Sequence, residues 1–327
     1  MSTTNIVIHA SQFPENVRRD RLSSLRTRRV NHKFHYDSVK QTNQWLALHH
    51  AHSPSRNDDD CAATYDRAFA GTVAGIESEA IHVLGLGCGG GQKDTRLLKL
   101  LRAAGKEVSY TPCDVAVAMT LVARQAALAV VPAGKCFPLV CDLATADDLP
   151  EVFAAHGGPG VARLITFFGM IPNFEPGEIL SKLAALIRPE DFLLFSANLA
   201  PGADYAAGVQ KILPQYDNAL TREWLMTFLV DLGVERGDGD LRFGIEAESA
   251  ASGLKKIVAR FQFTRARQIP VEDERFVFSV GDTMQLFFSY RYTPARVRRA
   301  LADHGLSVEA EWITPSGEEG VFRVKRG

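Results

Sequence analysis

The stretch that decides the fold reads Ile81-His82-Val83-Leu84-Gly85-Leu86-Gly87-Cys88-Gly89-Gly90-Gly91-Gln92-Lys93. Its first part is apolar and favours a buried β-strand, and residues 94–101 after it have the apolar spacing of a helix packed on that strand. The glycines between them leave the backbone free to adopt positive φ and to approach a ligand closely. This order of strand, glycine loop and helix predicts a nucleotide-cofactor loop, the alternative being a glycine-rich turn that binds nothing.

Two cofactors are compatible with the loop. A dinucleotide site has the spacing G-x-G-x-x-G, with an acid about 20 residues further on that holds a ribose. Here the run is G-L-G-C-G-G-G, and the glycines end before Gln92, Lys93 and Asp94. That run is closer to the G-x-G-x-G loop of class I methyltransferases, which bind S-adenosylmethionine (SAM). We therefore expect SAM, and an NAD-dependent oxidoreductase is the alternative.

Two aspartates support a cofactor at this edge of a sheet. Segments 108–114 and 136–142 read as short strands, and each ends in an acid, Asp114 and Asp142. In an open parallel sheet, ligands bind outside the carboxyl ends of the strands. We expect Asp114 to accept hydrogen bonds from ribose hydroxyls, and Asp142 with Leu143 to meet the adenine amino group and cover its ring. Either aspartate alone would more often be a turn residue or a helix cap.

Composition favours a small molecule as the partner. The 327 residues carry 37 Lys and Arg against 38 Asp and Glu, so no overall charge draws the chain to nucleic acid or to an anionic membrane. A hydrophobic share of 46% is enough for one large domain or two. No apolar run of about 18 residues and no secretory leader is seen. With five cysteines in no paired framework, we expect a cytoplasmic protein with reduced thiols, its oligomeric state left open.

Strands and helices alternate from 81 to 199, which predicts a doubly wound α/β sheet. After Pro201-Gly202 the pattern changes to a helical stretch over 205–232 and then to β-rich segments, which indicates an inserted α+β lobe. The chain is then expected to return to the sheet with segment 285–292. Strands at 306–313 and 320–324 would form an antiparallel hairpin at the sheet edge.

A histidine-rich segment, with His49, His50 and His52, precedes the glycine loop. Histidines this dense suggest a metal, but the acids that follow are sequence neighbours after a proline-interrupted turn, without the H-E-x-x-H spacing of one helix face. We therefore expect no metal site. The aspartates at 58–60 are interpreted as an N-cap run before a helix over 61–69.

With these residues in hand, the chain resembles the histidine Nα-methyltransferases of ergothioneine biosynthesis and their fungal relatives that N-methylate dimethylallyltryptophan. The resemblance runs from about Phe34 to the C-terminus and implies a class I methyltransferase fold. Its motifs are Phe34-His35-Tyr36-Asp37, Ser53-Pro54-Ser55-Arg56 where the family has Y-P-T-R, the loop with residues 93–98, Asp114, Asp142, I-x-N-F-x-P at 171–176, Tyr216-Asp217-Asn218 and Ser289-Tyr290-Arg291-Tyr292. Together these motifs are specific, although each is weak alone.

The resemblance implies roles for single residues. Lys93 would contact the cofactor carboxylate, and Asn173 the substrate amine. Tyr36 and Tyr216 would contact the substrate carboxylate, so that Asn173 and Tyr36 are the candidate catalytic residues. Methyl transfer is an in-line displacement that mainly demands positioning, and Asn173 can orient the nitrogen through its carbonyl oxygen. The alternatives are that Asn173 is a turn residue and that the two tyrosines are core aromatics whose hydroxyls reach solvent.

The chain departs from the family around the substrate side chain. Where the histidine enzymes hold the imidazole with a tyrosine and a glutamate, this sequence places His52 and Phe287, with Ser289 two residues further on. Pro172 replaces a glycine before Asn173 and removes a backbone donor. We therefore expect an N-methyltransferase for the amine of an amino acid or analogue other than histidine. Histidine as substrate and a non-catalytic binding module are the alternatives.

The expected domains are an N-terminal arm at 1–61 that belongs to the substrate lobe, a methyltransferase core at 62–199, an inserted substrate lobe at 200–288 and a return to the core at 289–327. Arm and insertion are expected to cover the cofactor cleft together, because Tyr36 and Tyr216 could not otherwise meet one substrate.

Overall fold

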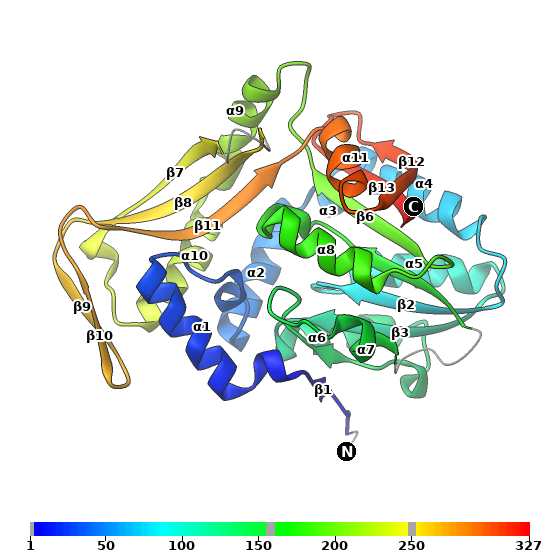
Figure 1. Ribbon diagram of the computed structural model, residues 1–327, viewed down its shortest axis with the longest axis horizontal. Helices are drawn as coiled ribbons and strands as arrows, with labels where there is room; N and C mark the ends of the chain where they lie inside the picture. Colours follow the sequence, from blue (N-terminus) through cyan, green and yellow to red (C-terminus); the bar gives the residue numbers. More distant parts are fainter. Residues whose placement is uncertain (1–2, 155–160, 248–252) are drawn as a thin grey trace. The chain divides into compact units, whose positions relative to one another are not determined.

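The computed structural model describes residues 3–154, 161–247 and 253–327 (Figure 1). The chain forms two compact units, each built from separate segments. The first unit comprises Met1–Gln12, Ser53–Leu199 and Tyr292–Gly327, and the second comprises Phe13–His52 and Ala200–Arg291. Compared with the expected division, Met1–Gln12 and residues 53–61 of the expected arm lie in the first unit, and residues 289–291 lie in the second.

The first unit is built on an eight-stranded sheet with the order β1-β4-β3-β2-β5-β6-β13-β12. Its strands are β1 Val7–Ile8, β2 Ala80–Leu86, β3 Glu107–Asp114, β4 Leu139–Val140, β5 Ala162–Phe167, β6 Phe192–Asn198, β12 Leu306–Ile313 and β13 Glu319–Arg326. All neighbours from β1 to β6 pair in parallel, whereas β13 is antiparallel to β6 and to β12. The doubly wound sheet and its C-terminal hairpin are thus confirmed.

Helices of the first unit form two groups, as judged by which helices contact one another. They are α3 Pro54–Asn57, α4 Asp59–Val73, α5 Gln92–Ala103, α6 Val117–Ala127, α7 Leu149–Ala154, α8 Pro176–Leu186 and α11 Pro294–Ala302. Helices α4, α5 and α6 contact one another in order, and so do α7, α8 and α11. Two such layers are typical of a doubly wound sheet. The Asp58 side chain accepts a hydrogen bond from the Cys61 amide, which confirms the predicted N-cap.

Strand order places the switch point of the sheet next to β2. The chain runs from β2 outward to β3 and β4, and then crosses to β5 on the other side of β2. Strand β2 is buried on both faces, with Ile81, Val83, Leu84 and Leu86 at most 1% exposed, as expected for a central parallel strand. The glycine loop after β2 therefore lies where open α/β sheets bind ligands.

The second unit combines helices with small antiparallel sheets. It contains α1 Pro14–Thr27, α2 Val39–His52, α9 Tyr205–Tyr216, α10 Ala219–Asp231, β7 Gly239–Ala247, β8 Lys255–Phe263, β9 Arg267–Val271, β10 Glu274–Phe278 and β11 Thr283–Arg291. Three strands pair in the order β11-β8-β7, and β9 pairs with β10. Leu22, Leu25 and Phe34 from the N-terminal segment belong to the same buried cluster as Trp224 and Phe261. The two segments of this unit thus share one core.

Three sequence predictions are corrected by the structure. Segment 205–232 forms two helices, because Asn218 caps α10 by accepting a hydrogen bond from the Thr221 amide. Segment 283–291 does not return to the main sheet but pairs with β8. The strand predicted over 136–142 is only β4, since Pro138 supplies no amide to the ladder.

None of the helices in the described part of the chain is long and apolar enough to cross a membrane.

Candidate functional site

The glycine loop has the backbone conformation that its pattern predicts. Gly87, Gly89 and Gly91 have φ values of +62°, +51° and +71°. A Cβ atom on Gly91 would lie 2.7 Å from the Cα atom of Ala123 in α6. Helices α5 and α6 therefore pack too closely for any side chain at the position where α5 begins.

A buried carboxylate, Asp94, supports the loop from the interior. It accepts hydrogen bonds from Tyr110 Oη at 2.6 Å and from Thr166 Oγ1 at 2.8 Å. Burial raises the pKa of Asp94 above its ordinary value, and these two hydrogen bonds oppose the shift. A Cβ atom on Gly85 would overlap Asp94 Oδ2. Gly85 is thus needed for close packing against Asp94, a role that the pattern of glycines did not indicate.

Asp114 ends β3 and lies directly against the loop. Its Oδ2 accepts the Gly89 amide at 3.0 Å, and its Oδ1 accepts the Ala116 amide at 3.3 Å. Burial raises the pKa of Asp114 to about 6, although these amide donors lower it. The carboxylate is 8% exposed. Oδ2 is thus bonded to the loop and Oδ1 to the start of α6, and each oxygen retains capacity to accept a further hydrogen bond.

Asp142 and Leu143 follow the neighbouring strand β4 and are buried, at 1% and 4% exposure. The Cys141 amide donates to the Asp114 carbonyl at 2.9 Å, so the two strand ends lie side by side. Asp142 Oδ1 accepts a hydrogen bond from the Ala144 amide at 3.0 Å. This is the turn contact expected of a single aspartate at a strand end. Its adenine contact stays a prediction.

Lys93, in the first turn of α5, contacts two residues that the sequence did not single out. Its Nζ donates to Tyr65 Oη at 2.7 Å and lies 3.5 Å from Glu319 Oε1. From the sequence alone, Tyr65 would be interpreted as an apolar core residue of its helix, and Glu319 as a charged residue of the C-terminal hairpin. No sequence signal connects them, because their pairing depends on the fold.

Asn173 lies half-buried at the carboxyl end of β5, the neighbour of β2. It ends the short 3₁₀ helix Ile171–Asn173, and its amide donates to Met170 O at 3.0 Å. Pro172 occupies the start of that helix, where no amide donor is required. The substitution of proline for glycine therefore costs no helical hydrogen bond. Asn173 shares the first unit with the glycine loop, Asp114 and Asp142.

Candidate substrate residues of the second unit gather in an aromatic group of Tyr36, Trp45, Tyr216, Trp224 and Phe287. The ring centroids of Phe287 lie 5.8 Å from Tyr216 and 6.0 Å from Trp224. The ring centroid of Tyr36 lies 5.6 Å from that of Trp224 and 6.0 Å from that of Trp45. All members except Trp224 are only half-buried. The group thus presents accessible aromatic surface within its own unit.

His52 lies outside this group. It is exposed at the end of α2, and none of the ring contacts in the described residues includes it. His49 instead stacks on Trp45, with ring centroids 4.7 Å apart. Within the described ranges, no cluster of three or more histidine, cysteine or acidic side chains has the arrangement of a metal site.

A polar edge borders the aromatic group at Tyr216. Its Oη is 2.8 Å from Ser289 Oγ and accepts a hydrogen bond from Arg291 Nη2. Phe287, Ser289 and Arg291 alternate along β11, so their side chains share one face.

Arg291 carries a charge that the described residues do not neutralise. It is 4% exposed and stacks 5.2 Å from the Tyr216 ring centroid. Across the described segments it forms no ion pair with an acid, and its Nε has no acceptor. Arg291 belongs to the motif Ser289-Tyr290-Arg291-Tyr292, but the sequence alone indicates no role for it. A buried cation without an anion is suited to bind one.

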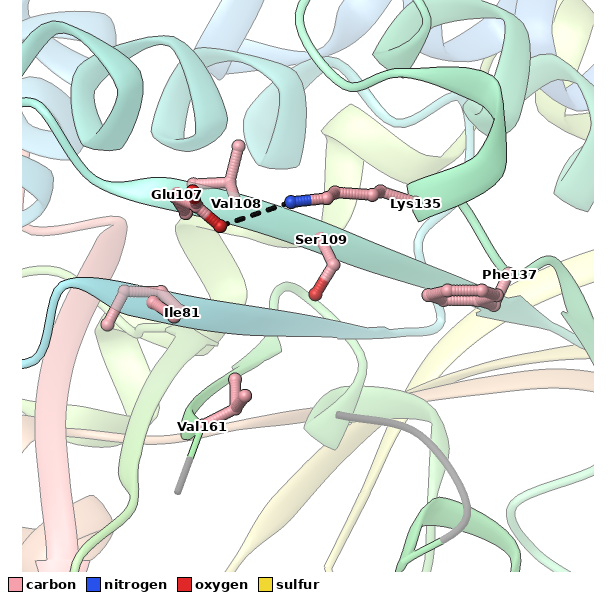
Figure 2. Close-up of a pocket in the computed structure, with 8 residues that line it drawn as sticks. Ile81, Glu107, Val108, Ser109, Lys135, Phe137 and Val161 are labelled. Carbon is pink, nitrogen blue, oxygen red and sulfur yellow. Dashed lines mark hydrogen bonds and ion pairs between the residues drawn. The ribbon is translucent and has the colours of Figure 1, made fainter. Parts of the chain in front are cut away.

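A hollow of about 340 Å³ lies within the first unit (Figure 2). It is lined by Ala80, Ile81, Glu107, Val108, Ser109, Lys135, Phe137 and Val161, and Lys135 Nζ lies 3.2 Å from Glu107 Oε2 across it. These residues include the starts of β2 and β3. The hollow therefore lies at the amino ends of the strands, opposite to the glycine loop, and is not the cofactor site.

Comparison with known proteins points to one family. A family model described as a histidine-specific, SAM-dependent methyltransferase matches residues 63–326. The N-methyltransferase imqF of Aspergillus flavus is 21% identical over 271 residues, which cover 82% of this chain and 72% of that protein.

The chain is also similar to solved methyltransferase structures at low sequence identity. The CcbJ methyltransferase of Streptomyces caelestis is 13% identical with a TM-score of 0.40, over 81% of this chain and 89% of that chain. The 1,6-didemethyltoxoflavin-N1-methyltransferase of Burkholderia thailandensis is 12% identical with a TM-score of 0.42, over 87% and 86%. Both scores are below 0.5, and the fold is defined by the strand order of the chain itself.

Proposed function

The chain belongs to the family of histidine-specific, SAM-dependent methyltransferases, and from this premise we propose that it methylates the amine of an amino acid, or of a similar small molecule, other than histidine. The family match removes the NAD-dependent oxidoreductase from consideration. One observation carries the substrate class: the buried Arg291 has no acid partner among the described residues and lies beside the aromatic group.

The first unit is proposed to hold the cofactor. Backbone atoms of Gly85, Gly87 and Gly89 would line it, Asp114 would accept its ribose hydroxyls, and Lys93 would bind its carboxylate. Asp142 and Leu143 would contact the adenine. SAM supplies a methyl group on a positively charged sulfur.

Asp114→Ala is expected to weaken SAM binding by about 1 to 3 kcal/mol, because ribose hydroxyls lose a buried acceptor. Asp147→Ala is the control, since that carboxylate in the same unit is 92% exposed. Titration calorimetry measures both variants. Wild-type affinity in Asp114→Ala would count against the assignment.

The same carboxylate makes binding depend on pH. Burial raises the pKa of Asp114 from 3.8 to about 6, so affinity should fall by up to about tenfold per unit below pH 6 as the acceptor is protonated. The free energy of unfolding changes in the opposite direction, and rises as the pH falls. The pKa of Asp114 is higher in the folded than in the unfolded protein. The cost of burying its charge is therefore present above pH 6 and is relieved as the pH falls towards 4. Asp114→Asn should remove both effects.

Chemistry at the amine requires positioning more than a base. A neutral amine nitrogen forms the new bond to the methyl carbon while the carbon–sulfur bond breaks, and the nitrogen then loses a proton to water. Asn173 would orient the nitrogen by accepting a hydrogen bond at its carbonyl oxygen, and Tyr36 would assist at the substrate carboxylate. Holding reactants in line can lower the barrier by several kcal/mol.

The second unit is proposed to hold the rest of the substrate. Tyr216, with Arg291 and Ser289 bonded to it, would bind the carboxylate. Phe287 offers an apolar surface where the resemblance places the glutamate of the histidine enzymes. Apolar or aromatic side chains should therefore be preferred.

Kinetics on histidine, tryptophan, tyrosine and small aliphatic amino acids test this preference. The best apolar or aromatic substrate should exceed histidine in kcat/KM by about tenfold or more, because the imidazole nitrogens lack a charged acceptor. Phe287→Glu should shift the ratio towards histidine. If histidine has the highest kcat/KM in the wild-type protein, the assignment around Phe287 is wrong.

A further inference from the structure

An ammonium and a carboxylate lie side by side at the carboxyl edge of the first unit's sheet. Lys93 Nζ is 3.5 Å from Glu319 Oε1, and the two side chains are 21% and 12% exposed. Lys93 directly follows the glycine loop, whereas Glu319 opens β13 opposite Asn198 at the end of β6. Both charges are therefore largely, but not fully, withdrawn from water.

Tyr65 holds this pair in place. Its hydroxyl has one hydrogen and two neighbouring acceptors, Glu319 Oε1 and Ser196 Oγ, the latter at 2.9 Å. The carboxylate is the stronger acceptor, so the hydrogen goes to Glu319 and Tyr65 Oη accepts from Lys93 at 2.7 Å. Ser196 Oγ, which accepts the Gly169 amide at 2.8 Å, can then donate to Tyr65. Every hydrogen of this hydroxyl network has an acceptor.

Lys93 and Glu319 still have unused capacity. An ammonium has three hydrogens, and within the described residues the oxygen acceptors of Lys93 are Tyr65 Oη and Glu319 Oε1, apart from the Tyr65 ring face at 4.2 Å. In the same residues, Glu319 Oε2 has one hydrogen-bond partner, the Cys61 thiol at 3.5 Å. Burial raises the pKa of that thiol, so it stays a weak, neutral donor. One donor and one acceptor thus remain available at adjacent positions.

We propose that Glu319 binds the α-ammonium group of the cofactor's methionine end, beside the α-carboxylate bound by Lys93. An α-amino acid carries both charges on one carbon, and the two side chains offer the complementary pair within 3.5 Å. A lysine alone would accept any acid, whereas the pair selects a zwitterion. Tyr65 is then a positioning residue that fixes both charges before the cofactor binds.

Binding calorimetry with four ligands tests the proposal without any substrate. The ligands are S-adenosylhomocysteine, its analogue without the amine, its analogue without the carboxylate, and 5′-methylthioadenosine, which lacks both. Glu319→Gln should weaken S-adenosylhomocysteine and the decarboxylated analogue by about tenfold to a hundredfold, because each loses a charged hydrogen bond. The deaminated analogue should bind equally or more tightly, since a negative charge near its carboxylate is gone. Methylthioadenosine should be unaffected.

Lys93→Met should give the mirror image, with losses for the two ligands that keep the carboxylate. Glu309→Gln is the matched control, because this acid lies on the same hairpin and pairs with Arg323 at 3.2 Å. The proposal is overturned if Glu319→Gln weakens the deaminated analogue or methylthioadenosine as much as S-adenosylhomocysteine, which would show a structural role only.

Wild-type protein supplies a second test in case Glu319→Gln does not fold. Removing the ligand's amine should weaken binding about tenfold or more. Equal affinity for S-adenosylhomocysteine and its deaminated analogue would overturn the proposal. Neither measurement depends on the identity of the methyl acceptor, so failure here leaves the proposed amine substrate to be judged by its own kinetics.

Discussion

Arg291→Met is expected to lower kcat/KM for an amino-acid substrate by about a hundredfold to a thousandfold, because truncating one partner of a buried, hydrogen-bonded charge pair costs roughly 2 to 5 kcal/mol. Arg291 is 4% exposed, and no acid among the described residues competes for it. The substrate carboxylate would be its counter-charge, reached directly or through Tyr216. Kinetics with tryptophan and with its decarboxylated amine, tryptamine, measure the effect.

The loss should be confined to substrates that carry the carboxylate. Tryptamine should be a poor substrate of the wild-type protein and be changed little by Arg291→Met. Arg260→Met, on the neighbouring strand β8, is the control, since that arginine is 37% exposed and pairs with Glu246. An equal loss for tryptophan and tryptamine would mean that Arg291 only supports the fold of β11.

Arg163→Leu is expected to lower the free energy of unfolding of the first unit by about 3 kcal/mol, because the buried Asp191 carboxylate loses its buried partner and keeps only the exposed Arg188 side chain. The side chains of Arg163 and Asp191 are 4% and 0% exposed. Arg163 Nε lies 3.0 Å from Asp191 Oδ2, and its Nη2 also donates to Leu186 O at 2.8 Å. Urea unfolding followed by fluorescence measures the change.

A second arginine that bonds the Asp191 carboxylate, Arg188, provides the control. Arg188 also bonds Asp191, at 3.2 Å, but its side chain is 45% exposed. Arg188→Leu should therefore cost less than about 1 kcal/mol. The SAM affinity of folded Arg163→Leu should be unchanged, because the pair lies at the amino ends of β5 and β6, away from the glycine loop. Similar costs for the two arginine variants would contradict the assignment of the buried pair.

Local patterns made the first unit predictable. The run from Ile81 to Lys93 contains a buried strand, a loop that needs positive φ and the start of a helix, and each of these is decided by neighbouring residues. The alternation of strands and helices then limits the sheet to a few topologies. Asp114 could be located for the same reason, because a strand end next to the loop is fixed by chain order.

Pairing between distant segments was not predictable. Strand β11 has a pattern that fits either sheet, and only its register with β8 assigns it to the second unit. Lys93, Tyr65 and Glu319 come from three elements, and nothing in the neighbourhood of any one of them indicates the other two. Arg291 stands in a motif, but its lack of an acid partner emerges only from the packing of described residues around it. The roles of His52, Tyr36 and Asn173 stay predictions.

The discontinuous core of the second unit has a consequence during synthesis. Leu22, Leu25 and Phe34 belong to a cluster completed by Trp224 and Phe261. Residues 53–199, roughly 150 in number, are translated between the two segments of the second unit. This takes about 8 to 30 s at about 5 to 20 residues per second. During that time the apolar face of α1 has emerged from the ribosome without its partners, while the first parallel strands can already collapse. We therefore expect nascent chains to need a chaperone at this segment, and slow translation before residue 200 to favour aggregation.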